Sequence, residues 1–174
     1  MKPRLTFLIA MVFGAAATRL LPHPPNLTPI AAMALFGGAY FADKRLAFLV
    51  PLAALLLSDI VMGLYNQIPV VYGSFALIVC LGFWLQKRRT WLRVAAATLV
   101  SSVLFFITTN FAVWAFGSLY PKTMEGLLAC YVAAIPFFRH TLLGDTLYAA
   151  VLFGGFALIE RWLLASRRPT FASA

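Results

Sequence analysis

Ionisable side chains are rare in the apolar stretches of this chain, so each one is a candidate for chemistry. Arg19, Asp59, Arg139, Asp145 and Glu160 lie within or beside apolar runs. A charged group in lipid is costly unless it is paired or hydrated, which makes such groups functional candidates by default. Arg139 precedes Asp145 by six residues and could pair with Asp59 or Asp145. These groups form either the polar lining of an outer pocket or a structural ion pair, whereas Glu160 is interpreted as an anchor near the inner surface.

Aromatic and amide side chains gather at the predicted outer ends of the apolar runs. An interfacial aromatic belt explains many of them. A pocket for a large ligand with a flat apolar face and amide edges requires the same mixture, and composition does not separate the two. The candidate ligand-binding residues are Tyr72, Phe75, Asn110, Tyr131, Phe137, Arg139 and Asp145.

Cys80 is the side chain with the most distinctive potential chemistry. It lies ten residues into a predicted helix, which puts it about 15 Å below the outer surface. Apolar surroundings raise a thiol pKa, so physics alone favours a small buried hydrophobe. A soft metal brought in by a ligand changes that expectation, because thiolates bind such metals well. Cys130, the second cysteine, has the same packing interpretation, and the two form no CxxC pair.

Small residues recur at every fourth position of the first apolar run, at Ala10, Gly14 and Thr18. This spacing lets another helix approach closely. The favoured interpretation is packing against the protein's own helices, and the alternative is docking on a partner membrane subunit.

The composition of the chain indicates that most of it lies in a lipid bilayer and not in water. Hydrophobic residues make up 63% of the chain and charged residues 11%, with a mean hydropathy of +0.90. A soluble protein carries about 25% charged residues, so we predict a single all-α integral membrane domain with six transmembrane helices. A short apolar segment at 126–138, closed by Pro136, is predicted to be interfacial or re-entrant. The six helices are expected at about 5–21, 29–41, 46–64, 70–86, 94–116 and 141–164.

The net charge of +9 is distributed between the apolar runs, mainly at alternate ends. This is the positive-inside pattern and not the stripe expected of a nucleic-acid-binding surface. It predicts cytoplasmic termini and a ligand site on the outer face. The N-terminal run resembles a secretory signal but is interpreted as an uncleaved first helix. The dipeptide Gly-Lys never occurs, so the chain lacks a P-loop for ATP hydrolysis.

Several segments, spread over nearly the whole chain, resemble the BtuM-type solitary S components of the energy-coupling-factor transporter family. The segments are Pro22-His23-Pro24-Pro25-Asn26-Leu27-Thr28-Pro29-Ile30, Gly73-Ser74-Phe75 leading to Cys80, Ser101–Phe106 with Thr109-Asn110-Phe111, Tyr120-Pro121, Cys130-Tyr131, Ala134–Arg139 and Leu142–Asp145.

This resemblance implies a six-helix, S-component-like bundle in the bacterial inner membrane that binds cobalamin as its substrate, with no cofactor of its own. It implies Cys80 as the axial cobalt ligand, with possible loss of an upper ligand such as cyanide. It also implies docking on a shared ATPase module through Ala10, Gly14 and Thr18, although solitary members are thought to work without a dedicated module. The alternatives are an S component for another vitamin, with Cys80 as packing, and a membrane scaffold protein without a small ligand.

Overall fold

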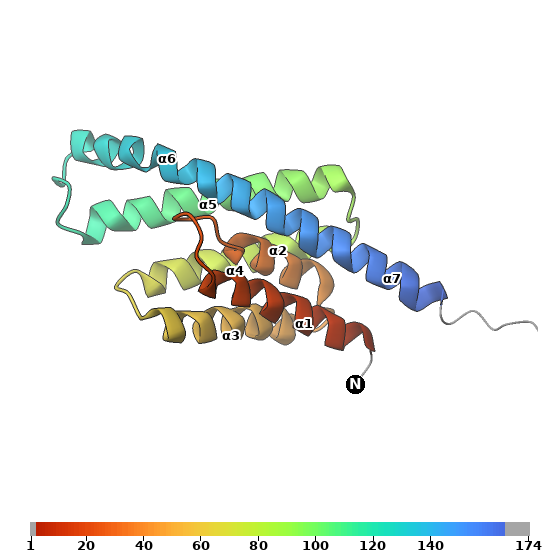
Figure 1. Cartoon of the computed structure of the whole chain (residues 1–174). Helices are drawn as coiled ribbons and strands as arrows, with labels where there is room; N and C mark the ends of the chain where they lie inside the picture. The colour runs from red at the N-terminus through yellow and green to blue at the C-terminus, as the bar shows by residue number, and fades with distance from the viewer. Residues whose placement is uncertain (1–2, 166–174) are drawn as a thin grey trace, which may run out of the picture.

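The computed structural model describes residues 3–165, and this range is built from helices joined by short loops (Figure 1). The all-helical fold predicted from composition is therefore confirmed. The elements are α1 (Pro3–Ala17), the 3-10 turn η1 (Thr18–Leu20), α2 (Ile30–Tyr40), α3 (Lys44–Met62), α4 (Ile68–Leu85), α5 (Trp91–Phe116), α6 (Met124–Ala149), the π-helical turn η2 (Ala150–Gly154) and α7 (Gly155–Ala165).

Helices long and apolar enough to cross a membrane account for most of the described residues. Five such stretches occur in the range 3–165. Arg4 of α1 and Glu160 of α7 form an ion pair at 3.0 Å, so the start of α1 and the end of α7 lie at the same end of the bundle (Figure 1). We call it the terminal end. Its location in the cytoplasm stays a prediction.

Helix α2 is the buried centre of the bundle. All of its 11 residues are buried, and it contacts α1, α3, α4, α5 and α6. At 1.5 Å per residue it is about 16 Å long, too short to cross the hydrocarbon core alone. A Cβ on Gly38 would lie 2.1 Å from the Val79 carbonyl oxygen, and one on Gly82 would lie 2.8 Å from the Gly38 Cα. These glycines allow α2 and α4 to touch backbone to backbone.

The predicted segment at 126–138 and the separate helix at 141–164 are wrong. One continuous helical stretch of 42 residues runs from Met124 to Ala165 and contains Pro136. The Thr123 hydroxyl caps its start by accepting a hydrogen bond from the Gly126 N–H at 3.2 Å. Proline is tolerated inside membrane helices because neighbouring groups satisfy the freed backbone. The α5–α6 hairpin consequently projects beyond the α3–α4 hairpin (Figure 1).

The π-helical turn η2 sits where the long helix passes α2. The rings of Phe153 and Phe156 lie 5.4 and 5.8 Å from the ring of Phe36, each nearly perpendicular to it. Phe156 also packs on Tyr40, with centroids 4.7 Å apart. Edge-to-face packing of this kind stabilises a core beyond simple area burial. These ring contacts hold the C-terminal half of the long helix against α2.

Candidate functional site

A cavity of about 330 Å³ opens at the end of the bundle opposite the terminal end. We call it the end cavity. It lies between the α1–α2 loop, the α3–α4 loop and the facing halves of α5 and α6. Its charged lining residues are Arg19 and Asp145. Its neutral polar lining residues are Asn26, Thr28, Gln67, Thr109, Asn110 and Thr141.

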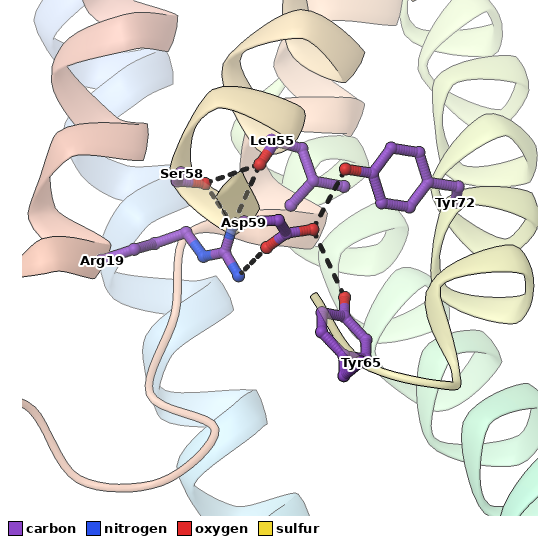
Figure 2. Close-up of polar contacts among 6 residues, drawn as sticks. All are labelled: Arg19, Leu55, Ser58, Asp59, Tyr65 and Tyr72. Atoms are coloured by element: carbon purple, nitrogen blue, oxygen red, sulfur yellow. Dashed lines mark hydrogen bonds and ion pairs between the residues drawn. The ribbon is translucent and has the colours of Figure 1, made fainter. Parts of the chain in front are cut away.

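One wall of the end cavity is fixed by a buried ion pair (Figure 2). Arg19 Nη2 lies 2.7 Å from Asp59 Oδ1, and the two side chains are 6% and 1% exposed. Arg19 Nη1 also donates to the Ser58 hydroxyl, and to the Leu55 carbonyl oxygen at 3.5 Å. Arg19 reaches these groups because α1 tightens into η1 at its end, which turns the side chain inward. The pair ties the end of α1 to α3.

The second oxygen of Asp59 connects this pair to α4 and to the α3–α4 loop (Figure 2). The Tyr72 hydroxyl donates to Asp59 Oδ2 at 3.0 Å, and the Tyr65 hydroxyl donates to it at 3.5 Å. Burial, followed by the nearby Asp59 carboxylate, raises the pKa of the Tyr65 phenol from 10.0 to about 12. Tyr65 therefore stays a neutral hydrogen-bond donor at physiological pH.

The predicted pairing of Arg139 with Asp59 or Asp145 is wrong. Arg139 is exposed, and Arg19 is the partner of Asp59. Because α6 is helical through this region, a separation of six residues puts Arg139 and Asp145 about 240° apart around the axis. The two side chains consequently leave the helix on different faces.

Asp145 closes the floor of the end cavity and is 2% exposed. Its Oδ2 accepts a hydrogen bond from the Ser102 hydroxyl of α5 at 2.7 Å. The carboxylate also accepts hydrogen bonds from the backbone N–H groups of Ala31 and Ala32, in the first turn of α2. Asp145 therefore supplies, from α6, the cap that the start of α2 needs.

The residue at the cap position of α2 is Pro29, and no side chain at that position caps the helix. A Cβ on Gly144 would lie 3.0 Å from the Thr28 backbone nitrogen. This close approach of the α1–α2 loop to α6 lets the neighbouring Asp145 reach the first turn of α2.

The structure brings three of the predicted ligand-binding residues together in the end cavity. Asn110, Phe137 and Asp145 all line it. Tyr72 does not line the cavity, but its hydroxyl donates a hydrogen bond to Asp59, the partner of the lining residue Arg19. A periodic face of α5 supplies further lining residues that are not among the predicted ones, including Phe105 and Thr109. Their spacing of four residues is the signal that would have found them.

The remaining predicted ligand-binding residues lie outside the end cavity. Phe75 is 0% exposed and belongs to the hydrophobic core. The Tyr131 hydroxyl donates to the Ile107 carbonyl oxygen at 2.8 Å, which joins α6 to α5. Arg139 is exposed and does not contribute to the lining.

Cys80 lies on a different face of α4 from the end cavity. Its side chain is exposed, whereas Val71 of the same helix lines the cavity. Cys80 follows Val71 by nine residues. At about 100° and 1.5 Å per residue, the two side chains point in opposite directions and lie about 13 Å apart along the helix axis. The expectation of a buried thiol is therefore wrong for Cys80. It holds for Cys130, which is buried and whose thiol lies 3.5 Å from the Asn110 carbonyl oxygen.

The three small residues of the first helix are divided between surface and interior contacts. Ala10 and Gly14 are exposed, and a Cβ on Gly14 would meet nothing within 4 Å. Thr18 instead shares a 2.7 Å hydrogen bond with the Tyr148 hydroxyl. Packing against the protein's own helices therefore does not account for Gly14.

Comparison with known proteins gives a family but no characterised relative. No curated protein and no solved structure matches the chain. One family model covers residues 1–168, which is nearly the whole sequence. The chain belongs to that family, described as "Family of unknown function (DUF6580)".

Proposed function

We propose that the protein binds a small organic solute in the end cavity and takes part in its passage across the membrane. The observation that carries this proposal is a cavity of about 330 Å³ in a bundle of apolar helices, with several polar lining residues, of which Arg19, Thr141 and Asp145 are buried. Its volume falls in the range of about 300–1,000 Å³ that small-molecule sites occupy. Polar groups in a membrane bundle are costly, so a site that gathers them indicates a functional use.

The lining suits a solute with an aromatic or flat apolar part and several hydrogen-bonding edges. Five aromatic side chains and three side-chain amides line the end cavity. Two amides, Asn26 and Gln67, come from the loops that border the cavity, and Asn110 comes from α5. The loops are the parts of the bundle that can move to admit a solute without breaking helix packing.

A direct test compares a filled cavity with an intact one. Ala134 lines the end cavity, and its neighbour Ala133 is exposed on the outside of α6. Small molecules that copurify with the wild type, in nanodiscs, are identified by mass spectrometry and titrated back. We expect Ala134→Leu to abolish their binding and Ala133→Leu to leave it unchanged. Equal binding by the two variants, or no bound solute from any screen, would contradict the proposal.

Cobalamin is the solute that the resemblance to BtuM-type S components implies, with Cys80 as its cobalt ligand. Two features of the structure favour a smaller solute. A whole corrinoid is larger than the end cavity, and Cys80 is exposed on the opposite face of α4 from Val71. Coordination of cobalt by Cys80 would need α4 to rotate or the corrinoid to approach from the lipid side.

The visible absorption spectrum of cobalamin mixed with the protein distinguishes these solutes. A corrin band that shifts with the wild type and not with Cys80→Ala would establish cobalamin and the cobalt–sulfur bond. Loss of cyanide from cyanocobalamin would extend that result to ligand removal. We expect no shift with either protein, in agreement with a smaller solute and a lipid-facing Cys80.

The energy source of the proposed transport is a separate question. A shared ATPase module is the partner that the resemblance implies, and exposed Ala10 and Gly14 offer a surface for close helix contact. Uptake of the identified solute into proteoliposomes without ATP would favour solitary action. Copurification of a protein partner with no solute bound would instead favour a scaffold role.

A further inference from the structure

The charges around the end cavity do not balance. The positive charge of Arg19 is already neutralised by Asp59, at 2.7 Å. Asp145 lines the same cavity, and among residues 3–165 no cationic side chain forms an ion pair with it. The nearest arginine or lysine along its own helix, Arg139, is exposed. The wall formed by Arg19, Asp59 and Asp145 therefore carries one net negative charge when all three are ionised.

The hydrogen bonds to Asp145 compensate only part of that charge. Its donors are the Ser102 hydroxyl and two backbone N–H groups, all formally neutral. The start of a helix contributes about half a positive charge. A carboxylate in the low-dielectric interior of a membrane bundle is stabilised much further by a full positive charge nearby. A cation held at the floor of the end cavity would therefore stabilise the ionised form of Asp145.

The aromatic side of the end cavity suits the same kind of group. The rings of Phe106 and Phe138 lie 4.8 Å apart and are tilted by 50°, and Phe105 and Phe137 line the cavity beside them. Ring faces attract an ammonium group, most strongly where water is excluded. Carboxylate and rings are independent features, on different residues, that favour the same ligand chemistry.

We propose that the solute carries a positively charged nitrogen, a protonated amine or a quaternary ammonium group, held between Asp145 and the phenylalanine rings. This inference rests on the proposed function of solute binding. The hydroxyl and amide groups around the rim, such as Thr141 and Asn110, then contact the uncharged part of the solute. Asp145 couples the bound cation directly to the first turn of α2.

The test uses three probes of similar size and different charge. Benzylammonium is the cation, benzyl alcohol the neutral analogue and benzoate the anion. Binding is measured by calorimetry on the full-length protein in phosphatidylcholine nanodiscs, with empty nanodiscs as the blank. We expect benzylammonium to bind about tenfold more tightly than benzyl alcohol, and benzoate to bind most weakly.

Three variants separate the charge of Asp145 from its structural role. Asp145→Asn removes the charge and is expected to abolish the preference for benzylammonium. Ser102→Ala removes a hydrogen bond and keeps the carboxylate, so the preference is expected to persist. Glu160→Gln removes a carboxylate at the terminal end and is the matched control. If Asp145→Asn does not fold, the wild-type series and Ser102→Ala still decide the question.

The outcomes distinguish this inference from the proposed function. Equal affinity of the wild type for benzylammonium and benzyl alcohol overturns the inference and leaves solute binding intact. Tighter binding of benzoate overturns it in the same way and points to Arg19. Absence of binding by all three probes, together with absence of any copurified solute, overturns both.

Discussion

The two ends of α2 are satisfied by different kinds of side chain. At the start of α2, the carboxylate of Asp145 accepts hydrogen bonds from backbone N–H groups and lines an open cavity. At the other end, the Gln86 amide donates to the carbonyl oxygens of Gly38 and Phe41, at 2.8 and 3.1 Å. Both ends are capped from other helices, because a buried helix end in a membrane bundle has no water to bond to.

The difference between the two ends indicates which one admits a solute. The Gln86 end is closed by a neutral amide and by the backbone contact between Gly38 and Gly82. The Asp145 end presents an ionisable carboxyl group, borders about 330 Å³ of space and is framed by loops. An ionisable group beside a cavity, such as Asp145, can bind a solute, whereas a neutral amide in a packed region, such as Gln86, stabilises the fold.

The largest effect is expected at the cavity end, from Asp59→Ala. Removal of this carboxylate leaves Arg19, which is 6% exposed, buried without its counter-ion. Breaking such a pair costs about 3–5 kcal/mol. The free energy of unfolding, measured by detergent denaturation in mixed micelles, should fall by this amount.

The matched control for Asp59→Ala is Glu160→Ala at the terminal end. Its ion pair with Arg4 is well exposed, with side-chain exposures of 41% for Arg4 and 34% for Glu160. Exposed pairs contribute about 0–1 kcal/mol. Equal losses of stability from the two variants would refute the assignment of Arg19 and Asp59 as a buried structural pair.

The next effect tests the closed end through Gly38→Ala. The added Cβ would lie 2.1 Å from a backbone oxygen of α4, so the two helices must separate. Overpacking of this kind costs about 1–3 kcal/mol. Gly14→Ala, on the exposed face of α1, has nothing within 4 Å and should leave the unfolding free energy within about 0.5 kcal/mol. A larger loss for Gly14→Ala than for Gly38→Ala would contradict the packing of α2 on α4.

The all-helical fold with long apolar helices follows from hydropathy, because the bilayer permits few architectures for an apolar chain. The predicted range 29–41 corresponds closely to α2, but its central, fully buried position is decided by tertiary packing around Gly38 and Gly82. The sequence predicts a break in the long helix because the apolar run at 126–138 is too short to cross a membrane and contains Pro136. In a membrane helix, neighbouring groups satisfy the backbone around a proline.

The site was only partly predictable from sequence. Asp145 is a candidate because ionisable groups in apolar helices are rare, and Asn110 is one because it belongs to the predicted outer cluster of aromatic and amide side chains. The structure places both in one cavity. The partner of Asp59 was missed because Arg19 reaches it through the short turn η1, which no periodic pattern reveals. Asp145 was not recognised as the cap of α2 because the two are far apart in the sequence.

A smaller effect compares the two caps of α2 directly. Gln86→Leu removes both hydrogen bonds to the carbonyl oxygens at the closed end, and Ser102→Ala removes one hydrogen bond to Asp145. A buried polar group left without its partner costs about 1–3 kcal/mol. We expect Gln86→Leu to lower the unfolding free energy more than Ser102→Ala. The opposite order would show that the cavity end, not the closed end, carries more of the stability of α2.

The smallest effect is expected at Cys80, which lies outside both ends of α2. Its thiol is exposed on α4, while Cys130 is buried against α5. Cys80→Ala removes one exposed sulfur and should change neither the unfolding free energy, beyond about 0.5 kcal/mol, nor the affinity for benzylammonium. Cys130→Ala should destabilise the protein more, because it leaves a small void.

In micelles, N-ethylmaleimide should modify Cys80 before Cys130, as followed by intact mass. Protection of Cys80 by a bound solute would place it at the site after all, and would return the cobalt–thiolate hypothesis to first position.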